Sequence, residues 1–178
     1  RVCRGALAFM DRRENAPLSV SATNGQQARD GLRLSKGPFM FGLKTEAYFD
    51  SAHFLADYYG KCENLHGHRW RVVVYLEQGE LQTDGTMRDM VLDFGVFKRA
   101  VRELAETFDH TFLVEEGTLK PATIEALEGE GFSLTILPFR TTAENLARVF
   151  CERLTEQGLP VSQVDMYETP NNCAIYRP

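Results

Sequence analysis

Residues 66–76 read His-Gly-His-Arg-Trp-Arg-Val-Val-Val-Tyr-Leu, and this stretch decides the kind of fold that the chain can adopt. Apolar side chains recur at every second position from Trp70 to Leu76. This alternation is typical of a strand with one buried face. His66 and His68 share the parity of Trp70, so period-two geometry directs both imidazoles to the same side of the sheet. The stretch therefore predicts a strand that also carries a site.

A second strand precedes this one, and a helix follows it. Apolar side chains of one parity run from Phe39 to Phe49, which predicts another half-buried strand. Asp84-Gly85 indicates a turn. Asp93 is a suitable N-cap for a helix with apolar residues at three- and four-residue steps. These residues are Phe94, Phe97, Val101, Leu104 and Phe108.

The remaining pattern completes an α+β domain. Residues 121–131 suggest a short helix, and residues 133–139 a strand. Thr141-Thr142-Ala143-Glu144 is a capping box that opens a long helix ending at Gly158. Two short strands, 164–169 and 173–176, follow it. Two strands, a helix, an insertion, a helix and two strands predict a single α+β domain over residues 39–178.

Length and composition agree with one domain. The chain has 178 residues, of which 43% are hydrophobic, enough for one full core. Residues 1–38 differ, because Asp11 to Gly37 is rich in polar residues and glycine and has no periodicity. We interpret residues 1–38 as a flexible arm or an expression remnant, with Met40 as the natural start.

Charge and cysteine content exclude several classes of protein. The net charge of -5 argues against a nucleic-acid or anionic-membrane binder. No stretch approaches the roughly 20 apolar residues of a membrane span. The cysteines are too few and too scattered for a secreted disulfide framework, which predicts a reducing, cytoplasmic setting. They are Cys3, Cys62, Cys151 and Cys173.

The histidines of the chain lie at positions where they could form a functional site. His53, His66 and His68 can supply three neutral ligands to a divalent metal and leave one coordination position open. The alternative is a group of half-buried rings bonded to nearby carbonyls. Cys62 admits two roles, because it could close the metal site as a fourth ligand or act as a low-pKa base or nucleophile.

Two further groups are candidates for the same site. Asp109 could orient His110 for proton transfer, or the two could be a surface pair at a helix end. Glu168 has the parity of Val164 and Met166, so an apolar face carries a carboxylate that needs a partner. A flat heterocycle with adjacent N–H donors would satisfy both oxygens. A salt bridge to Arg177 or Arg140 is the alternative.

Several motifs together resemble the 6-pyruvoyltetrahydropterin synthase and 6-carboxytetrahydropterin synthase family. They are Tyr48-Phe49-Asp50-Ser51-Ala52-His53, Cys62 to His68, Leu92-Asp93-Phe94, Asp109-His110, Thr142-Ala143-Glu144-Asn145, Tyr167-Glu168-Thr169 and Ala174-Ile175-Tyr176. The resemblance covers about residues 39–177. Three residues between Cys62 and His66 resemble the bacterial 6-carboxytetrahydropterin synthases of queuosine and deazapurine biosynthesis, whereas the pyruvoyl-forming animal enzymes have a longer spacer.

The resemblance implies a tunnelling fold, an antiparallel sheet with two long helices packed on one face. It implies a homo-oligomeric barrel, a trimer or hexamer, with active sites at subunit interfaces. It also implies conversion of 7,8-dihydroneopterin triphosphate to 6-carboxytetrahydropterin, with loss of acetaldehyde and triphosphate. A small-molecule pterin would then be the partner, with no nucleic acid or membrane.

Residue by residue, the resemblance implies that His53, His66 and His68 hold zinc (Zn²⁺). Cys62 would be the base that removes a side-chain proton, and Asp109 with His110 the second proton relay. Glu168 would bind the amino-pyrimidinone edge of the pterin. Thr142 would add a hydrogen bond to the ring.

Two points stay open at this level. About thirty residues, roughly 112–140, replace a much shorter link of the family, so the product could be a pyruvoyl or related pterin instead. A non-catalytic, zinc-stabilised pterin-binding protein is a third possibility. The triphosphate calls for cations, and the candidates near the motifs are Lys44, Lys61, Arg69 and Arg71.

Overall fold

The two alternating stretches form a pair of long strands. The computed structural model describes residues 40–178, and the arm predicted over residues 1–38 lies outside that range. Strand β1 (Phe41–His53) and strand β2 (His66–Gln78) pair antiparallel along their whole length, with His53 opposite His66. The loop between them contains a short 3-10 turn, η1 (Lys61–Glu63). This register brings the histidines of both strands to one end of the pair.

Helix α1 (Phe94–Glu106) follows the predicted pattern. The carboxylate of Asp93 accepts hydrogen bonds from the backbone N–H groups of Gly95 and Val96 at 2.8 and 3.1 Å. Phe94 departs from the expected apolar stripe, because 56% of its surface is exposed. It is the first residue of the helix and lies at the edge of the stripe. The other predicted residues of the stripe, Phe97, Val101, Leu104 and Phe108, are buried.

Asp93→Ala is expected to lower the free energy of unfolding by about 1 kcal/mol, because two backbone N–H groups at the start of α1 lose their acceptor. Urea denaturation of both proteins measures the difference. Asp93→Asn, which keeps an acceptor oxygen, should retain most of the stability. Equal destabilisation by alanine and asparagine would argue against the cap.

Helix α3 (Ala143–Glu156) begins one residue later than the predicted capping box requires. The N-cap is Thr142, whose hydroxyl oxygen accepts from the backbone N–H of Asn145 at 3.3 Å. Thr141 is completely buried, and its hydroxyl donates to the carbonyl of Phe54. Because the Thr141 hydroxyl is engaged there, the Thr141–Glu144 box does not form. The predicted stop is confirmed, since Gly158 follows the helix at a φ of +87°.

The complete sheet is mixed, whereas an antiparallel sheet was predicted. The strand order is β4-β3-β1-β2-β5-β6. The antiparallel part adds β5 (Val161–Thr169) and β6 (Asn172–Tyr176) to the long pair. The other two strands, β3 (Thr111–Glu115) and β4 (Leu134–Leu137), are parallel to their neighbours and are linked by helix α2 (Pro121–Gly129). Sequence reasoning missed β3 because Phe112-Leu113-Val114 is a continuous apolar run without alternation.

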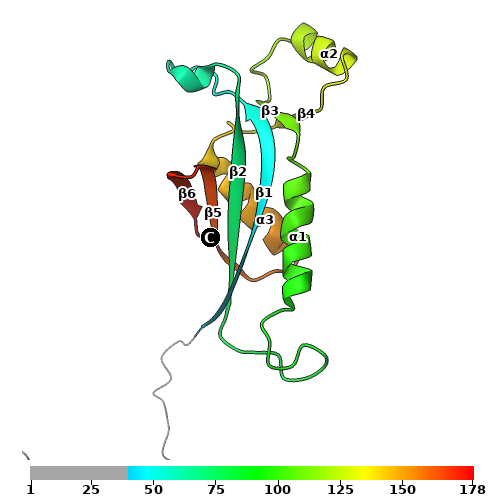
Figure 1. Ribbon diagram of the computed structural model, residues 1–178, viewed down its shortest axis with the longest axis vertical. Coiled ribbons are helices and arrows are strands. Elements are labelled where there is room, and N and C mark those ends of the chain that lie inside the picture. Colours follow the sequence, from blue (N-terminus) through cyan, green and yellow to red (C-terminus); the bar gives the residue numbers. More distant parts are fainter. Residues whose placement is uncertain (1–39) are drawn as a thin grey trace, which may run out of the picture. The chain divides into compact units, whose positions relative to one another are not determined.

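The core lies on one face of the antiparallel strands, under α1 and α3 (Figure 1). Stacked and tilted aromatic rings of Phe49, Trp70, Phe108 and Phe150 occupy its centre, with centroids 5.4 to 6.0 Å apart. This confirms the prediction of two long helices on one face. The segment β3-α2-β4 extends the sheet; Leu113 of β3 and Leu137 of β4 belong to the core, whereas no residue of α2 is buried.

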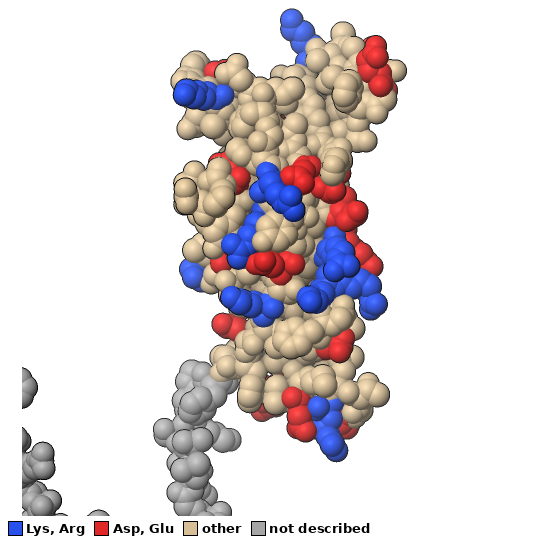
Figure 2. Space-filling model, viewed as in Figure 1, with Lys and Arg blue, Asp and Glu red and all other residues tan. Residues whose placement is uncertain are grey.

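The surface of the displayed face carries both signs of charge. Figure 2 shows lysine and arginine interspersed with aspartate and glutamate over its middle, whereas charged side chains are sparser at the end that carries α2. No helix within residues 40–178 is long and apolar enough to cross a membrane.

Candidate metal and active site

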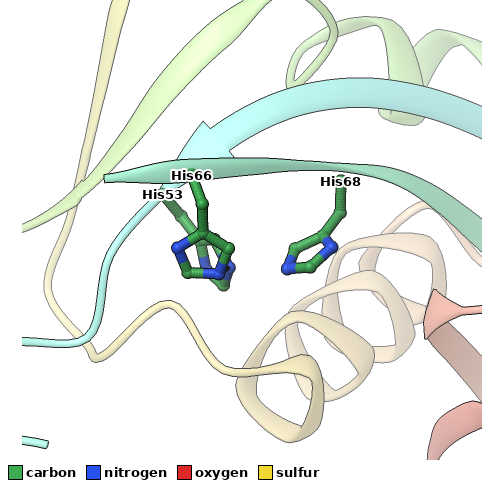
Figure 3. A group of neighbouring side chains, drawn as sticks. All are labelled: His53, His66 and His68. Carbon is green, nitrogen blue, oxygen red and sulfur yellow. Dashed lines mark hydrogen bonds between the residues drawn. The ribbon is translucent and has the colours of Figure 1, made fainter. Parts of the chain in front are cut away.

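Three histidines from the two long strands converge at one end of the sheet. His53 ends β1, and His66 and His68 begin β2. Their rings lie on the same side of the strands (Figure 3), and one ring nitrogen of each lies within 4.8 Å of the others. His53 is completely buried. The group therefore has the donor atoms and the proximity to hold a metal ion.

In two of the three histidine rings, a backbone carbonyl determines which ring nitrogen carries the proton. The Nδ1 atom of His53 lies 2.8 Å from the carbonyl oxygen of Thr141, and that of His66 lies 2.7 Å from the carbonyl oxygen of Asn64. A carbonyl oxygen only accepts, so each Nδ1 must be the donor. The Nε2 atoms of the two neutral rings therefore bear lone pairs, and these atoms face each other at 3.1 Å.

Two facing lone pairs at this distance need a cation between or beside them. The third ring adds to this requirement, because Nε2 of His68 is buried and has no hydrogen-bond partner in the part of the chain that the structure describes. Three converging imidazole nitrogens, with two of the rings held from behind by carbonyl groups, are the usual arrangement of a metal site with an open position. The residues present thus fit a divalent metal.

Burial favours the neutral form of His53 and of His68. Desolvation lowers the pKa of His53 from its ordinary value of 6.5 to about 4, although the bond to Thr141 opposes that shift. Desolvation also lowers the pKa of His68, against the attraction of the Glu168 carboxylate. Neutral imidazole is the form that binds a metal, so the protein environment favours the ligand state near neutral pH.

Glu168 lies directly beside the histidines. Its Oε1 is 3.5 Å from Nε2 of His68 and 3.7 Å from Nε2 of His53, and 27% of its side chain is exposed. The structure gives it no arginine partner within residues 40–178. Arg177 donates to Gln163, and Arg140 to the carbonyl of Ala56. One carboxylate at the mouth of the group is thus available to a ligand.

Cys62 is not among the converging donor atoms, and Thr142 is the N-cap of a helix. Cys62 is partly buried in η1, its carbonyl accepts from the N–H of Leu55 at 2.9 Å, and its sulfur is not among the atoms that converge with the histidines. The hydroxyl oxygen of Thr142 caps α3. The role of Cys62 as a fourth ligand finds no support in this geometry.

Asp109 and His110 bond to each other and to β1. One carboxylate oxygen of Asp109 accepts from the N–H of Asp50, and the other from Nδ1 of His110, both at 2.7 Å. The N–H of His110 donates to the carbonyl of Asp50 at 2.7 Å. The ring of His110 is 80% exposed. Asp109 therefore holds an accessible imidazole in a defined orientation beside β1.

His110 is expected to titrate above 6.5, because its hydrogen bond to Asp109 raises its pKa by favouring the protonated ring. The raised pKa adds stability that is complete below about 6.5 and is lost as the pH rises through the pKa of the folded state. Proton NMR of the ring measures this titration. Asp109→Asn should lower the pKa, whereas Glu106→Gln should change it little. An unchanged titration in Asp109→Asn would contradict the pairing.

Two cavities adjoin the beginning of β2. The larger has a volume of about 1060 Å³ and extends from the ends of β1 and β2 to α2; His68 and His110 both line it. The smaller, of about 500 Å³, contains Glu168. Gly67, His68 and Arg69 line both cavities. The inserted segment contributes Leu119, Thr123, Leu127 and Phe132 to the larger one.

Sequence reasoning missed the groups that orient two of the three histidines. Thr141 and Asn64 act through their backbone carbonyls, which leave no signature in the sequence. It also could not separate Arg69 from the other cations. Only the register of the strands places Arg69 at both cavities.

Solved structures with this fold include 6-pyruvoyltetrahydropterin synthases and an uncharacterized protein. An uncharacterized protein of Wolinella succinogenes matches with a TM-score of 0.60 and 22% identity, over 78% of this chain and 98% of that one. A catalytic-residue mutant of Plasmodium vivax 6-pyruvoyltetrahydropterin synthase matches with a TM-score of 0.58 and 20% identity, over 79% and 98%. The shared fold is that of the tunnelling-fold pterin synthases.

Sequence comparison then defines the family. The family described as 6-pyruvoyl tetrahydropterin synthase matches residues 42–178. A 6-carboxy-5,6,7,8-tetrahydropterin synthase of Haemophilus influenzae is 36% identical over 78% of this chain and 99% of its own length. One from Synechocystis is 31% identical, over 77% and 93%. The chain belongs to the 6-pyruvoyl tetrahydropterin synthase family.

Proposed function

We propose that this protein is a zinc-dependent lyase that converts 7,8-dihydroneopterin triphosphate to 6-carboxy-5,6,7,8-tetrahydropterin, with release of acetaldehyde and triphosphate. The observation that carries the proposal is the convergence of three imidazole nitrogens beside a free carboxylate in a chain of this family. The similar Haemophilus and Synechocystis proteins bear the name of the 6-carboxy synthase. The three-residue spacer between Cys62 and His66 supports the same branch.

In this proposal His53, His66 and His68 hold zinc. When bound, zinc would supply a Lewis acid for the hydroxyl groups of the substrate side chain. The carbonyls of Thr141 and Asn64 keep the rings of His53 and His66 oriented toward the metal. Nitrogen ligands of borderline softness in a three-histidine set favour zinc over magnesium or calcium.

The protein side chains would bind the pterin and move protons. Glu168 accepts two N–H groups from the amino-pyrimidinone edge, and Thr142 adds a hydrogen bond to the ring. Cys62 removes a proton from the side chain. Asp109 and His110, already hydrogen-bonded at 2.7 Å, form the second proton relay.

An oligomer would assemble these groups around one substrate. Cys62 is not among the atoms that converge with the three histidines of its own chain, so we propose sites at the interfaces of a homotrimer or homohexamer. Two open strand edges support this. On its outer side, β1 has no strand partner from Phe41 to Phe49 within residues 40–178, and β6 ends the sheet on the other side. The strand directions allow β6 of one copy to pair antiparallel with β1 of the next, which closes a ring.

The proposed setting is queuosine or 7-deazapurine biosynthesis in the cytoplasm. Cys62, Cys151 and Cys173 are free thiols, as expected in a reducing compartment. The segment β3-α2-β4 would then be an addition that walls the larger cavity.

A product assay tests the proposal. Purified protein with stoichiometric zinc is incubated with 7,8-dihydroneopterin triphosphate, and acetaldehyde, triphosphate and pterins are quantified. Acetaldehyde and 6-carboxytetrahydropterin in equal amounts are expected. Triphosphate release without acetaldehyde would indicate a pyruvoyl-forming or related lyase instead. Binding of pterin and zinc without any product would indicate a non-catalytic protein.

A further inference from the structure

The two cavities at the beginning of β2 have few cationic side chains. Of the four candidate cations near the motifs, Lys44 and Lys61 line neither cavity. Arg71 lines only the smaller cavity, whereas Arg69 lines both. Among the described residues, Arg69 and Arg71 are thus the lysine or arginine residues that line these cavities, which also contain Asp50, Glu63 and Glu168.

Arg71 already has a carboxylate partner. Its Nε and one terminal nitrogen lie 3.0 and 2.8 Å from Oε2 of Glu46 on the neighbouring strand. Its guanidinium also lies over the ring of Tyr167, 4.8 Å from the centroid. These contacts neutralise and orient Arg71, so its charge contributes little to an incoming anion.

Arg69 has no such partner among the described residues. It lies opposite Asp50 in the strand register, but no ion pair or hydrogen bond joins its guanidinium to a carboxylate within residues 40–178. Its guanidinium lies over the ring of Tyr48, 5.4 Å from the centroid. Contact with the ring face restrains the side chain and leaves the in-plane N–H donors free.

The position of Arg69 suits a polyphosphate. Arg69 follows His68 in β2 and so projects from the opposite face of the strand, but both residues line both cavities. In dihydroneopterin triphosphate the triphosphate is attached to the short side chain whose hydroxyl groups would face the histidines. The phosphates would therefore lie in the cavities that His68 and Arg69 share. Arginine binds phosphate through two parallel N–H donors, which a lysine cannot do.

We infer that Arg69 binds the triphosphate of the substrate, where the two cavities meet. This assignment rests on the proposed function and extends it, because it selects one cation from the four near the motifs. It makes Arg69 a substrate-positioning residue, separate from the metal ligands and from the groups that move protons.

Calorimetric titration of the full-length, zinc-loaded protein with inorganic triphosphate tests the assignment. Arg69→Met should bind triphosphate about tenfold more weakly, the loss expected for a charge-assisted hydrogen bond at an exposed position. Arg69→Lys should retain part of the affinity, because it keeps the charge. Zinc content and the unfolding midpoint should be unchanged in both, since the side chain is exposed.

A matched control separates a site from general surface charge. Arg88→Met removes an arginine that is 70% exposed and lines neither cavity. It should bind triphosphate like the unmodified protein. Equal weakening in Arg69→Met and Arg88→Met would overturn the assignment. So would unchanged triphosphate affinity in Arg69→Met accompanied by a smaller oligomer, which would indicate that Arg69 pairs with a second copy.

The same variants distinguish failure of this assignment from failure of the proposed function. With dihydroneopterin triphosphate as substrate, Arg69→Met should raise KM by about the same factor and change kcat less. Binding of dihydroneopterin without phosphates should be unaffected. If no acetaldehyde forms, the proposed function is wrong. The triphosphate titration then still shows whether Arg69 binds triphosphate. If acetaldehyde forms but Arg69→Met binds triphosphate normally, only the assignment of Arg69 falls.

Discussion

His68→Ala is expected to release the metal and to lower turnover at least about a thousandfold. The metal would supply several kcal/mol of stabilisation to developing negative charge, and about 4 kcal/mol corresponds to a factor of about a thousand. His68 is a better choice than His53, because its side chain is 18% exposed whereas that of His53 is completely buried. Its removal therefore leaves a smaller cavity in the core.

Metal content per chain and kcat measure the effect. His110→Ala is the matched control, because its ring lies outside the ligand group and is 80% exposed. It should keep full metal content while losing activity as a relay residue. If His68→Ala retained one metal ion per chain with unchanged affinity, the three-histidine site would be wrong.

Cys62→Ala is expected to lower turnover at least about a hundredfold while metal content and stability stay unchanged. A positioned general base contributes about 10² to 10⁴ to the rate, and Cys62 is the proposed base. A structural ligand would behave differently, because its loss would weaken metal binding and destabilise the fold. The geometry favours loss of turnover with unchanged metal content, because the sulfur of Cys62 is not among the converging donor atoms.

Turnover, metal content and the urea midpoint should be measured together for this variant. Cys173→Ala is the control, because it removes another free thiol that is exposed and lines neither cavity. It should behave like the unmodified protein. Loss of metal or of stability in Cys62→Ala would assign Cys62 to the metal site and would favour the non-catalytic alternative.

The paired strands and two helices could be predicted because each depends on local periodicity. The relevant signals lie within a few residues of the element that they specify. They are the alternation around Trp70, the N-cap carboxylate of Asp93 and the helix stop at Gly158. The parity of Glu168 with Val164 and Met166 likewise placed a carboxylate on a buried face, and the structure puts it 3.5 Å from His68.

Other elements depended on contacts that are distant in sequence. Strand β3 forms because Leu113 and Val114 are buried between β1 and β4. No local sequence pattern predicts the pairing of β3 with these strands. The N-cap of α3 is Thr142 and not the predicted Thr141, because the Thr141 hydroxyl donates a hydrogen bond to the carbonyl of Phe54. In both cases tertiary contacts overrode a local preference.

By itself the sequence determined the α+β class and the order of the antiparallel strands and helices, and it identified histidine, cysteine and carboxylate side chains as candidates for the functional groups. These follow from periodicity and from residue chemistry, which are properties of short segments. Only the tertiary structure decided that His53 meets His66, that the carbonyls of Thr141 and Asn64 leave both Nε2 atoms unprotonated, and that Arg71 is paired while Arg69 is not. Those outcomes depend on strand register and on backbone groups far apart in the chain, and a difference of one residue in register would reverse them.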